Sequence, residues 1–426
     1  MLKRYKMLGL LGTLGLLLVS AAANAQDNTA KFRLKPGAFG KLCQDCHPGF
    51  EDKLKKSNVH TPVKKGDCTG CHNPHTSDFK KLLSAEPKKI CSTCHPSVAP
   101  KDAKSVHKVV ADGECLKCHD PHSSMTKNNL LKAGNELCLD CHKSLSGRIA
   151  KAKVQHAPVK KDCLICHAPH GSAKEASLLK ERVTALCTGC HKTDQPIFVK
   201  KHMNYPVANS NCVYCHDPHG SDRKGILYNN VHKPVSAMMC NQCHEEATSP
   251  NALKTKREGA ELCKGCHNEM YNTAFGKNRI HSPLLTKQAC LSCHNPHAGK
   301  EKGLLRETPI QLCGKCHADT IKRQEMSVTK HEPVKGGECA ACHDPHASNA
   351  PLLMKQESVV DGCGTCHDWM KHSTHPIGEK FKDPRNKNRN LDCLSCHRSH
   401  GTEFKGMLPF KTVTDLCVQC HEKFRR

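Results

Sequence analysis

The chain has 426 residues, of which 32 are cysteine, 32 are histidine and only 16 are aromatic. Apolar residues make up 37% of the sequence and the mean hydropathy is −0.59. Side chains alone therefore cannot build the hydrophobic core of an ordinary globular protein of this length. The formal net charge is +25, which would suit nucleic acid or an acidic membrane surface as a partner.

Residues 1–25 have the pattern of a secretory signal peptide. The basic stretch MLKRYK is followed by the apolar stretch MLGLLGTLGLLLVS, and small residues precede a cleavage site after Ala25. A retained membrane anchor is the alternative, but the apolar stretch is short for a span. No cysteine directly follows the cleavage point, so a bacterial lipid anchor is not expected. We expect a mature protein in the periplasm or outside the cell, with no integral membrane segment.

Every cysteine belongs to a C-x-x-C pair that is followed at once by histidine. This pattern is the attachment motif of c-type haem, in which two cysteines form thioethers with the porphyrin and the histidine binds iron from one face. Zinc ribbons also use paired C-x-x-C, but zinc gives no reason for a histidine after each pair. We expect sixteen covalent haems, held by Cys43, Cys46 and His47; Cys68, Cys71 and His72; Cys91, Cys94 and His95; Cys115, Cys118 and His119; Cys138, Cys141 and His142; Cys163, Cys166 and His167; Cys187, Cys190 and His191; Cys212, Cys215 and His216; Cys240, Cys243 and His244; Cys263, Cys266 and His267; Cys290, Cys293 and His294; Cys313, Cys316 and His317; Cys339, Cys342 and His343; Cys363, Cys366 and His367; Cys393, Cys396 and His397; and Cys417, Cys420 and His421.

Two types of motif alternate along the chain. B-type motifs are followed by x-Pro-His, as in CTGCHNPH, whereas A-type motifs have no trailing histidine and often follow an apolar residue. The resulting two-haem period of about 48 residues predicts a repeat architecture. Stretches such as NNLLKAGNELC, ahead of A-type motifs, suit one or two helical turns. We expect a mostly irregular fold with short α-helices, wrapped around a chain of covalent haems, with little or no β structure.

The period breaks once, near Cys240. The lead-in HKPVSAMMC is that of a B-type motif, but NQCHEEA follows without a trailing histidine. We predict an N-terminal eight-haem array over 26–219, a seam over 220–262 that includes the ninth motif, and a C-terminal haem array over 263–426. An ordinary surface insertion explains the break equally well.

Sixteen histidines lie outside the motifs, one for each expected haem. Iron that is bound by histidine on both faces has no vacant position, so it stores and passes electrons and does not readily bind a substrate. A trailing histidine lies too near its own motif to reach the opposite face of the same haem, so we expect it to bind a neighbouring haem. The expected distal ligands are His60, His75, His107, His122, His156, His170, His202, His219, His232, His281, His297, His331, His346, His372, His375 and His400.

The haems would supply the missing apolar interior, so we expect the haem-free chain to be largely unfolded. Their propionates also account for the basic composition. Removal of Lys3, Arg4 and Lys6 with the signal peptide leaves +22, which the two carboxylates of each haem largely offset. Aromatic stacking platforms are missing, so nucleic acid is not an expected partner.

The alternation of CxxCHxPH and CxxCH, joined by His-x-Pro-Val and Leu-Leu spacers, resembles the doubled-CxxCH multihaem c-type cytochromes. These include the periplasmic decahaem electron conduits of metal-reducing bacteria. The resemblance extends from about Lys41 to His421. It implies a string of bis-histidine haems in alternating stacked and perpendicular contact, and electron transfer across or beyond the cell envelope. Sixteen haems exceed the familiar members, and the break near Cys240 departs from their alternation.

We therefore expect an electron conduit and not an enzyme. Its partners would be redox proteins, namely other cytochromes, a membrane quinol-oxidising complex or an outer-membrane porin, or further copies of the chain. One alternative is a multihaem reductase with one open haem, either that of His244 or the one whose ligand is His372 or His375. The other is a subunit of an extracellular cytochrome filament, which shares the chemistry and differs in assembly.

Overall fold

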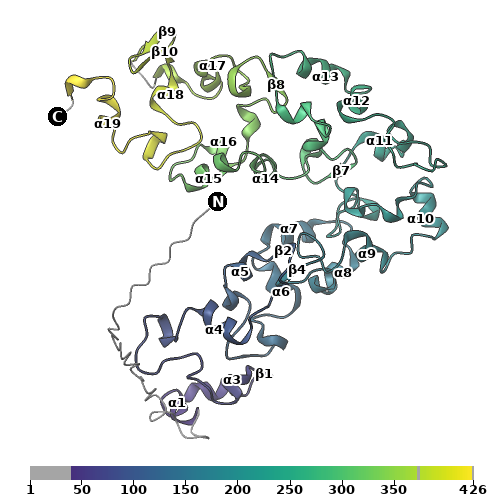
Figure 1. Ribbon diagram of the computed structural model, residues 1–426, viewed down its shortest axis with the longest axis vertical. Coiled ribbons are helices and arrows are strands. Elements are labelled where there is room, and N and C mark those ends of the chain that lie inside the picture. Colours follow the sequence, from purple (N-terminus) through teal and green to yellow (C-terminus); the bar gives the residue numbers. More distant parts are fainter. Residues whose placement is uncertain (1–39, 372–374, 425–426) are drawn as a thin grey trace, which may run out of the picture. The chain divides into compact units, whose positions relative to one another are not determined.

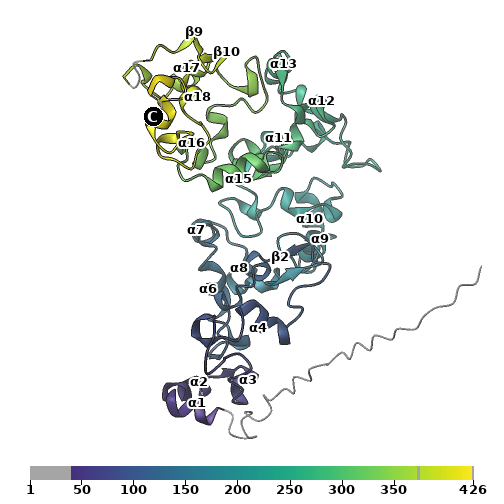
Figure 2. The ribbon, with the colours of Figure 1, turned by 60° about the vertical axis from the view of Figure 1, so that its left-hand side comes forward.

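The computed structural model describes residues 40–371 and 375–424, so the predicted signal peptide and His372 lie outside the described residues. Contacts divide the described chain into two compact units, one formed by 40–96 with 112–132 and the other by 97–111 with 133–424. Each unit consists of short helices joined by irregular chain (Figure 1, Figure 2). No described helix is long and apolar enough to cross a membrane.

A short α-helix carries each A-type motif, as its apolar lead-in predicts. Proline occupies an early position in two of these helices, where its missing N–H costs no hydrogen bond. The helices are α1 (Lys41–Cys46), α4 (Pro87–Cys94), α6 (Gly134–Leu139), α9 (Val183–Thr188), α12 (Gly259–Lys264), α14 (Pro309–Gly314), α17 (Val359–Gly364) and α19 (Val413–Cys417). Further helices follow these motifs, namely η2 (Pro48–Phe50), α2 (Glu51–Leu54), α7 (Lys143–Lys151), α10 (Pro196–Lys201), α13 (Asn268–Phe275), α15 (Ala318–Met326), η16 (Trp369–Lys371) and η18 (Glu422–Phe424).

Most B-type motifs begin with a single helical turn instead. These turns are η4 (Cys115–Lys117), η6 (Cys163–Ile165), η8 (Cys212–Tyr214), η10 (Cys240–Gln242), η12 (Ala289–Ser292), η14 (Cys339–Ala341) and α18 (Cys393–Cys396). A second tight turn follows, with positive φ at residues such as Asn128 and Gly303, which tolerate that conformation. These second turns are η3 (Lys80–Leu82), η5 (Lys127–Asn129), η9 (Lys224–Ile226), η13 (Lys302–Leu304), η15 (Pro351–Leu353) and η17 (Lys405–Met407).

Short helices also follow the histidines that lead into B-type motifs. In α3 and α8 the proline of the His-x-Pro-Val spacer takes an early helical position. The helices are α3 (Thr61–Lys64), α5 (Lys108–Ala111), α8 (Ala157–Lys161), η7 (Val207–Asn209), α11 (Lys233–Ser236), η11 (Ser282–Leu285) and α16 (Glu332–Lys335).

Two-residue antiparallel strand pairs join successive repeats within a unit. In each pair, the residues just before a lead-in histidine bond to the residues just after the trailing histidine of a later B-type motif. The pairs are β1 (Asn58–Val59) with β3 (Ser123–Ser124), β2 (Ser105–Val106) with β4 (Gly171–Ser172), β5 (Asn230–Val231) with β7 (Ala298–Gly299), and β6 (Arg279–Ile280) with β8 (Ala347–Ser348). A fifth pair, β9 (Gly378–Asp383) with β10 (Asn386–Leu391), is a local hairpin outside this pattern.

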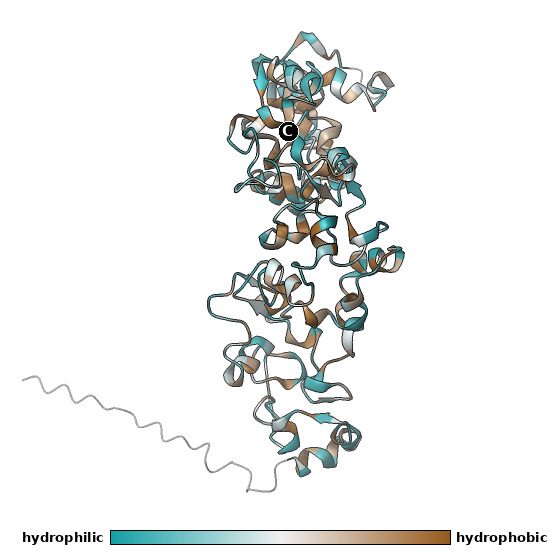
Figure 3. Ribbon diagram, turned by 90° about the vertical axis from the view of Figure 1, so that its right-hand side faces the viewer, coloured by the Kyte–Doolittle hydropathy of each residue, from teal (hydrophilic) through white to brown (hydrophobic). Residues whose placement is uncertain are grey.

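The described residues contain almost no apolar core. Their buried apolar side chains are Tyr205, Ala252, Ala274, Ala289, Ala298, Ala347 and Ala350. Large apolar side chains remain exposed, including Met125 at 69% and Leu352 at 83%. Apolar and polar residues intermingle along the ribbon without an apolar layer (Figure 3). The predicted fold class, mostly irregular with short helices and only short strands, is therefore confirmed.

Candidate haem-binding sites

Histidine rings from distant parts of the chain lie in pairs with a nearly constant spacing. The ring centres of His72 and His122 are 6.1 Å apart, and those of His244 and His297 are 5.9 Å apart. An imidazole nitrogen binds a metal ion at about 2 Å, so imidazoles on opposite sides of one iron have ring centres roughly 6 Å apart. The spacing therefore fits one haem iron between the two rings of each pair.

The pairs follow two rules within the repeat. The histidine that leads into a B-type motif reaches forward to the next A-type motif, in the pairs His60–His95, His107–His142, His156–His191, His232–His267, His281–His317, His331–His367 and His375–His421. The trailing histidine reaches back to the preceding B-type motif, in the pairs His72–His122, His167–His219, His244–His297, His294–His346 and His343–His400.

The pairing changes where the sequence period breaks. The motif at Cys240 has no trailing histidine that could reach back to His216. His202, which leads into the motif of His216, pairs with it instead, at 6.3 Å and with the ring planes at 59°. His216 has no trailing histidine as its partner, and His202 has no A-type motif directly after its own B-type motif. The two histidines therefore pair with each other.

A hydrogen bond between Nδ1 and a backbone oxygen orients many of these rings. The Nδ1 atoms of the B-type motif histidines bond to backbone oxygens nine or ten residues later, at Lys81, Asn128, Ser177, Gly225, Leu253, Gly303, Leu352 and Gly406. Those of the lead-in histidines bond to the oxygens of Pro121, Pro169, Pro218, Pro296 and Pro345, or of Phe198 for His202. A proton on Nδ1 leaves the lone pair of Nε2 for iron, so these carbonyls select the binding tautomer.

Backbone hydrogen bonds couple the predicted ligands of different candidate haem sites. The amide of His60 donates to the oxygen of His122 at 2.9 Å, and that of His232 donates to the oxygen of His297 at 2.9 Å. Within each couple one histidine serves an A-type motif and the other serves a B-type motif. A displacement of one ligand would therefore be transmitted to the next site.

The trailing histidines have acidic neighbours in three repeats. Nδ1 of His219 lies 3.6 Å from Oδ1 of Asp217, whose side chain is buried next to Arg148 and Lys300. Burial alone would raise the pKa of Asp217, but the nearby His219, whose backbone amide donates a hydrogen bond to it at 3.1 Å, and the charge of Lys300 hold it below its usual range. The corresponding distances are 3.8 Å for Asp120 with His122 and for Asp344 with His346.

Burial also affects the protonation of several predicted ligand histidines. Since burial penalises the charged ring, it lowers the pKa of His122, His156, His167, His216, His297, His346 and His400. These histidines are therefore neutral near pH 7, which is the form that binds a metal ion.

The cysteines form a continuous series in chain order within each unit. All 32 lie in the described residues and none is in a disulfide. First cysteines of neighbouring A- and B-type motifs interact directly, in the pairs Cys43–Cys68, Cys91–Cys115, Cys138–Cys163, Cys187–Cys212, Cys263–Cys290, Cys313–Cys339 and Cys363–Cys393. The remaining neighbours interact electrostatically through Cys71–Cys94, Cys166–Cys190, Cys215–Cys240, Cys243–Cys266, Cys293–Cys316, Cys342–Cys363 and Cys396–Cys420.

These contacts perturb the free thiols strongly. Burial and the contact with Cys115 raise the pKa of Cys91 above its usual range, whereas the hydrogen bond with Cys187 lowers the pKa of Cys212. The series also passes through the predicted seam, because Cys215 interacts with Cys240 and Cys243 with Cys266. The division of the chain into two haem arrays at 220–262 stays a prediction.

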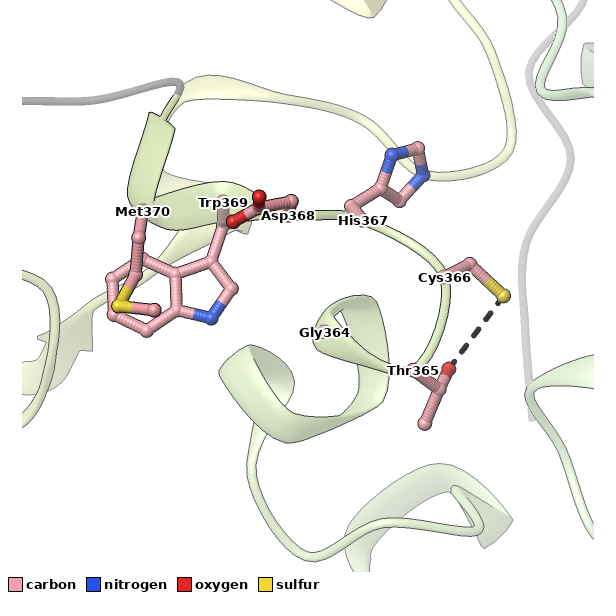
Figure 4. A pocket seen from close by; sticks show the side chains of 7 residues that line it. All are labelled: Gly364, Thr365, Cys366, His367, Asp368, Trp369 and Met370. Carbon is pink, nitrogen blue, oxygen red and sulfur yellow. Dashed lines mark hydrogen bonds between the residues drawn. The ribbon is translucent and has the colours of Figure 1, made fainter.

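A shallow cavity of about 360 Å³ lies beside the motif that begins at Cys363. It is lined by residues 364–370, including Cys366, His367 and Trp369 (Figure 4). Because the lining includes a motif cysteine and its histidine, the cavity belongs to the candidate haem site at this motif.

The structure places most of the predicted ligand histidines in the pairs above, while His372 lies outside the described residues. The use of these histidines as iron ligands stays a prediction. The acidic partners Asp120, Asp217 and Asp344 were not predicted from the sequence. The signal that could have revealed them is the residue x of CHxPH, which is aspartate in these three repeats.

Comparison with known proteins identifies the family. The doubled CXXCH motif family matches residues 60–100, 107–147, 156–196, 204–231, 232–272, 281–322, 331–372 and 386–426. The chain is also 33% identical over 212 residues to the multiheme cytochrome MtrA of Shewanella baltica (strain OS185). That alignment covers 46% of this chain and 55% of the relative, so the chain spans about half the length of the curated relative it matches.

Repeated haem-attachment motifs in a chain whose described residues have almost no apolar core define a multihaem c-type cytochrome, a class of electron-transfer proteins. The chain belongs to the doubled CXXCH family, with eight matched doubled repeats and many covalently bound haems c. This confirms the family predicted from the sequence.

Proposed function

We propose that the chain holds sixteen haems in one ordered series and passes electrons from each to its neighbours. The observation that carries this proposal is that motif cysteines neighbouring in the chain lie close together within each unit. The first cysteines of paired A- and B-type motifs are in direct contact, and the other neighbours lie within electrostatic range. Since each cysteine pair attaches one porphyrin, neighbouring thiols in contact hold neighbouring porphyrin edges close together. Haem iron changes between its ferric and ferrous forms and so supplies a one-electron carrier at each site.

The chain's own residues fix the position and the ligation of each carrier. Cysteines attach it, a motif histidine and a distant histidine bind from opposite faces, and backbone carbonyls orient the rings. His75, His170 and His372 complete the set of sixteen distal ligands. With two histidines at every iron no position is open to substrate, so we propose a conduit and not an enzyme.

We further propose that the conduit operates across or beyond the cell envelope. The predicted signal peptide and the similarity to a protein named multiheme cytochrome MtrA support this location. Other cytochromes, a membrane quinol-oxidising complex or an outer-membrane porin are the proposed partners. A filament of identical chains is the alternative assembly, and electron micrographs of the purified protein over a range of concentrations distinguish the two.

The decisive experiment is low-temperature EPR of the fully oxidised protein, combined with haem quantification. We expect sixteen haems per chain, all with low-spin ferric signals, because two imidazoles at each iron impose a strong ligand field. A high-spin signal from about one haem per chain would reveal an open site and favour the reductase alternative. A content well below sixteen in fully matured protein would contradict the proposed series.

A further inference from the structure

The hairpin of β9 and β10 is an insertion into the repeat. Eight positions separate the lead-in histidine from the first cysteine at His60 and Cys68 and at His331 and Cys339, whereas 18 positions separate His375 from Cys393. The extra residues form the hairpin, which turns at Pro384 and Arg385. It lies beside α17 and α18 in both views (Figure 1, Figure 2).

The turn of the hairpin is fixed to a haem-attachment motif. Arg385 donates to both carboxylate oxygens of Asp383, at 2.9 and 2.6 Å, and to the backbone oxygen of Ser395 at 2.7 Å. Asp383 is only 4% exposed, and Ser395 lies between the two cysteines of α18. This bidentate ion pair holds the hairpin against the site at Cys393 and Cys396.

Both ends of the hairpin are also tied to haem sites. Before β9, the ring of His375 pairs with that of His421 in the last motif, with ring centres 6.2 Å apart. After β10, the side chain of Asp392 caps α18 by accepting a hydrogen bond from the amide of Leu394. The hairpin is thus a rigid element between the last two candidate haem sites of the chain.

The exposed charged side chains of the hairpin strands are mostly basic. Lys380, Lys382, Lys387 and Arg389 are all exposed, and Glu379 is the exposed acid on the two strands. No described carboxylate forms an ion pair with any of these four cations. Side chains alternate along a strand, so Lys380 and Lys382 share one face of β9, and Lys387 and Arg389 share one face of β10. We call these four residues the hairpin cations. Lys382 pairs with Asn390 and donates to its side-chain oxygen at 2.8 Å.

We propose that the hairpin cations form the docking site for the acidic face of a redox partner protein. The site rests on the proposed conduit function and assigns its C-terminal end as a point of electron entry or exit. Four cations without a described carboxylate partner, on a support fixed by hydrogen bonds, attract an acidic partner over a long range and orient it on encounter. Docking there places the partner next to the haems of Cys393 and Cys396 and of Cys417 and Cys420, where an electron crosses the shortest distance.

A structural role as a cap on the last repeat is the competing explanation, because terminal repeats often differ from internal ones. Such a cap would need the ion pair of Asp383 with Arg385 but would not need the hairpin cations. Reversal of the outer charges, with that ion pair left intact, therefore separates docking from capping.

The test uses the full holoprotein with Lys380→Glu, Lys382→Glu, Lys387→Glu and Arg389→Glu combined. A matched control carries Lys143→Glu, Lys151→Glu, Lys160→Glu and Lys161→Glu, four exposed cations of the repeat region. The probe is flavodoxin, an acidic electron-transfer protein, in its hydroquinone form, and stopped-flow absorbance follows haem reduction. At low salt we expect haem reduction in the hairpin variant to be roughly tenfold slower than in the unaltered protein. In the control variant it should be slower by no more than about twofold. Added salt should remove the difference.

Equal slowing in both variants, or no slowing in the hairpin variant, would overturn the docking site. Dithionite reduction of the same samples tests the conduit separately, since this small reductant needs no docking protein. If all haems take up electrons from dithionite in every variant, a negative flavodoxin result counts against the hairpin and not against the conduit. Hairpin-dependent binding to anionic phospholipid vesicles, with none to flavodoxin, would also overturn the proposal by assigning the surface to a membrane.

Discussion

Where aspartate or asparagine precedes a Pro-His dipeptide, it has two separable effects on a predicted haem ligand. Its side-chain oxygen accepts a hydrogen bond from the amide of the trailing histidine, and aspartate and asparagine do this equally well, at 3.1 Å for both Asp217 with His219 and Asn73 with His75. Only aspartate adds a negative charge beside the ligand ring. A partner anion makes an imidazole a stronger electron donor, which stabilises ferric iron and lowers the reduction potential.

We therefore predict that Asp217→Asn raises the reduction potential of one haem, the one attached at Cys163 and Cys166. The loss of one partly screened charge is worth about 1 kcal/mol, or roughly 40 mV for a one-electron couple. Anaerobic potentiometric titration of variant and unaltered protein measures the difference. Asn295→Asp is the reciprocal control and should shift the haem of His297 in the opposite direction. Unchanged titrations with full haem content would contradict the prediction.

The trailing histidine itself offers a second test at this scale. His219→Ala removes the ring that lies 6.2 Å from that of His167, so one iron loses its second imidazole. We expect one high-spin ferric haem per chain in the EPR spectrum, with the other haems unchanged. Met125→Ala, at an exposed methionine after another trailing histidine, is the control and should remain fully low-spin. A fully low-spin His219→Ala protein would disprove the assignment of this ligand.

At the scale of elements, short backbone pairings hold the repeats in register. Val154 and Ser221 exchange two backbone hydrogen bonds at 2.8 and 2.9 Å, and Gly220 between His219 and this pairing has φ of +125°. A Cβ atom there would lie 2.8 Å from the oxygen of Val154. Gly401 repeats the arrangement, with φ of +132° and 2.7 Å to the oxygen of Thr329.

We predict that Gly220→Ala destabilises the holoprotein by about 1–3 kcal/mol, because it combines a disfavoured φ with a backbone clash. Gly147→Ala is the matched control, since Gly147 lies within α7 with nothing within 4 Å of the added atom. That change should stabilise by about 0.5–1 kcal/mol through helix propensity. Denaturation midpoints followed by circular dichroism give both values, and equal midpoints for the two variants would refute the clash.

The elements differ in how far the sequence could predict them. The helices ahead of A-type motifs were predictable, because their apolar residues recur at helical spacing. The hairpin was not, since β9 reads Gly-Glu-Lys-Phe-Lys-Asp and only Phe381 is apolar, so no alternation of apolar and polar residues marks it. The number of histidine pairs was predictable from the sequence, but which two histidines form each pair was not. The forward reach of His60 and the backward reach of His122 depend on turns with positive φ, which spacing alone does not reveal.

At the scale of the whole molecule, the described residues bury one tyrosine and six alanines as their apolar side chains. Ordering a residue costs about 1–2 kcal/mol of backbone entropy, and burial of alanines cannot offset this cost over hundreds of residues. The porphyrin faces and the proposed iron–histidine bonds are therefore expected to supply the interactions that hold the fold together.

We therefore predict that the same chain without haem does not fold. Chain synthesised without its signal peptide, and so without c-type haem attachment, should show a far-ultraviolet circular dichroism spectrum of an unfolded protein and no cooperative thermal transition. Its cysteines should react with a thiol reagent at once, whereas those of the holoprotein are blocked as thioethers. Limited proteolysis of both forms is the comparison, with rapid cleavage throughout the haem-free chain and slow cleavage of the holoprotein. A haem-free chain that resists proteolysis and melts cooperatively would contradict this prediction. It would show that side-chain contacts alone stabilise the fold and that the haems are not needed for folding.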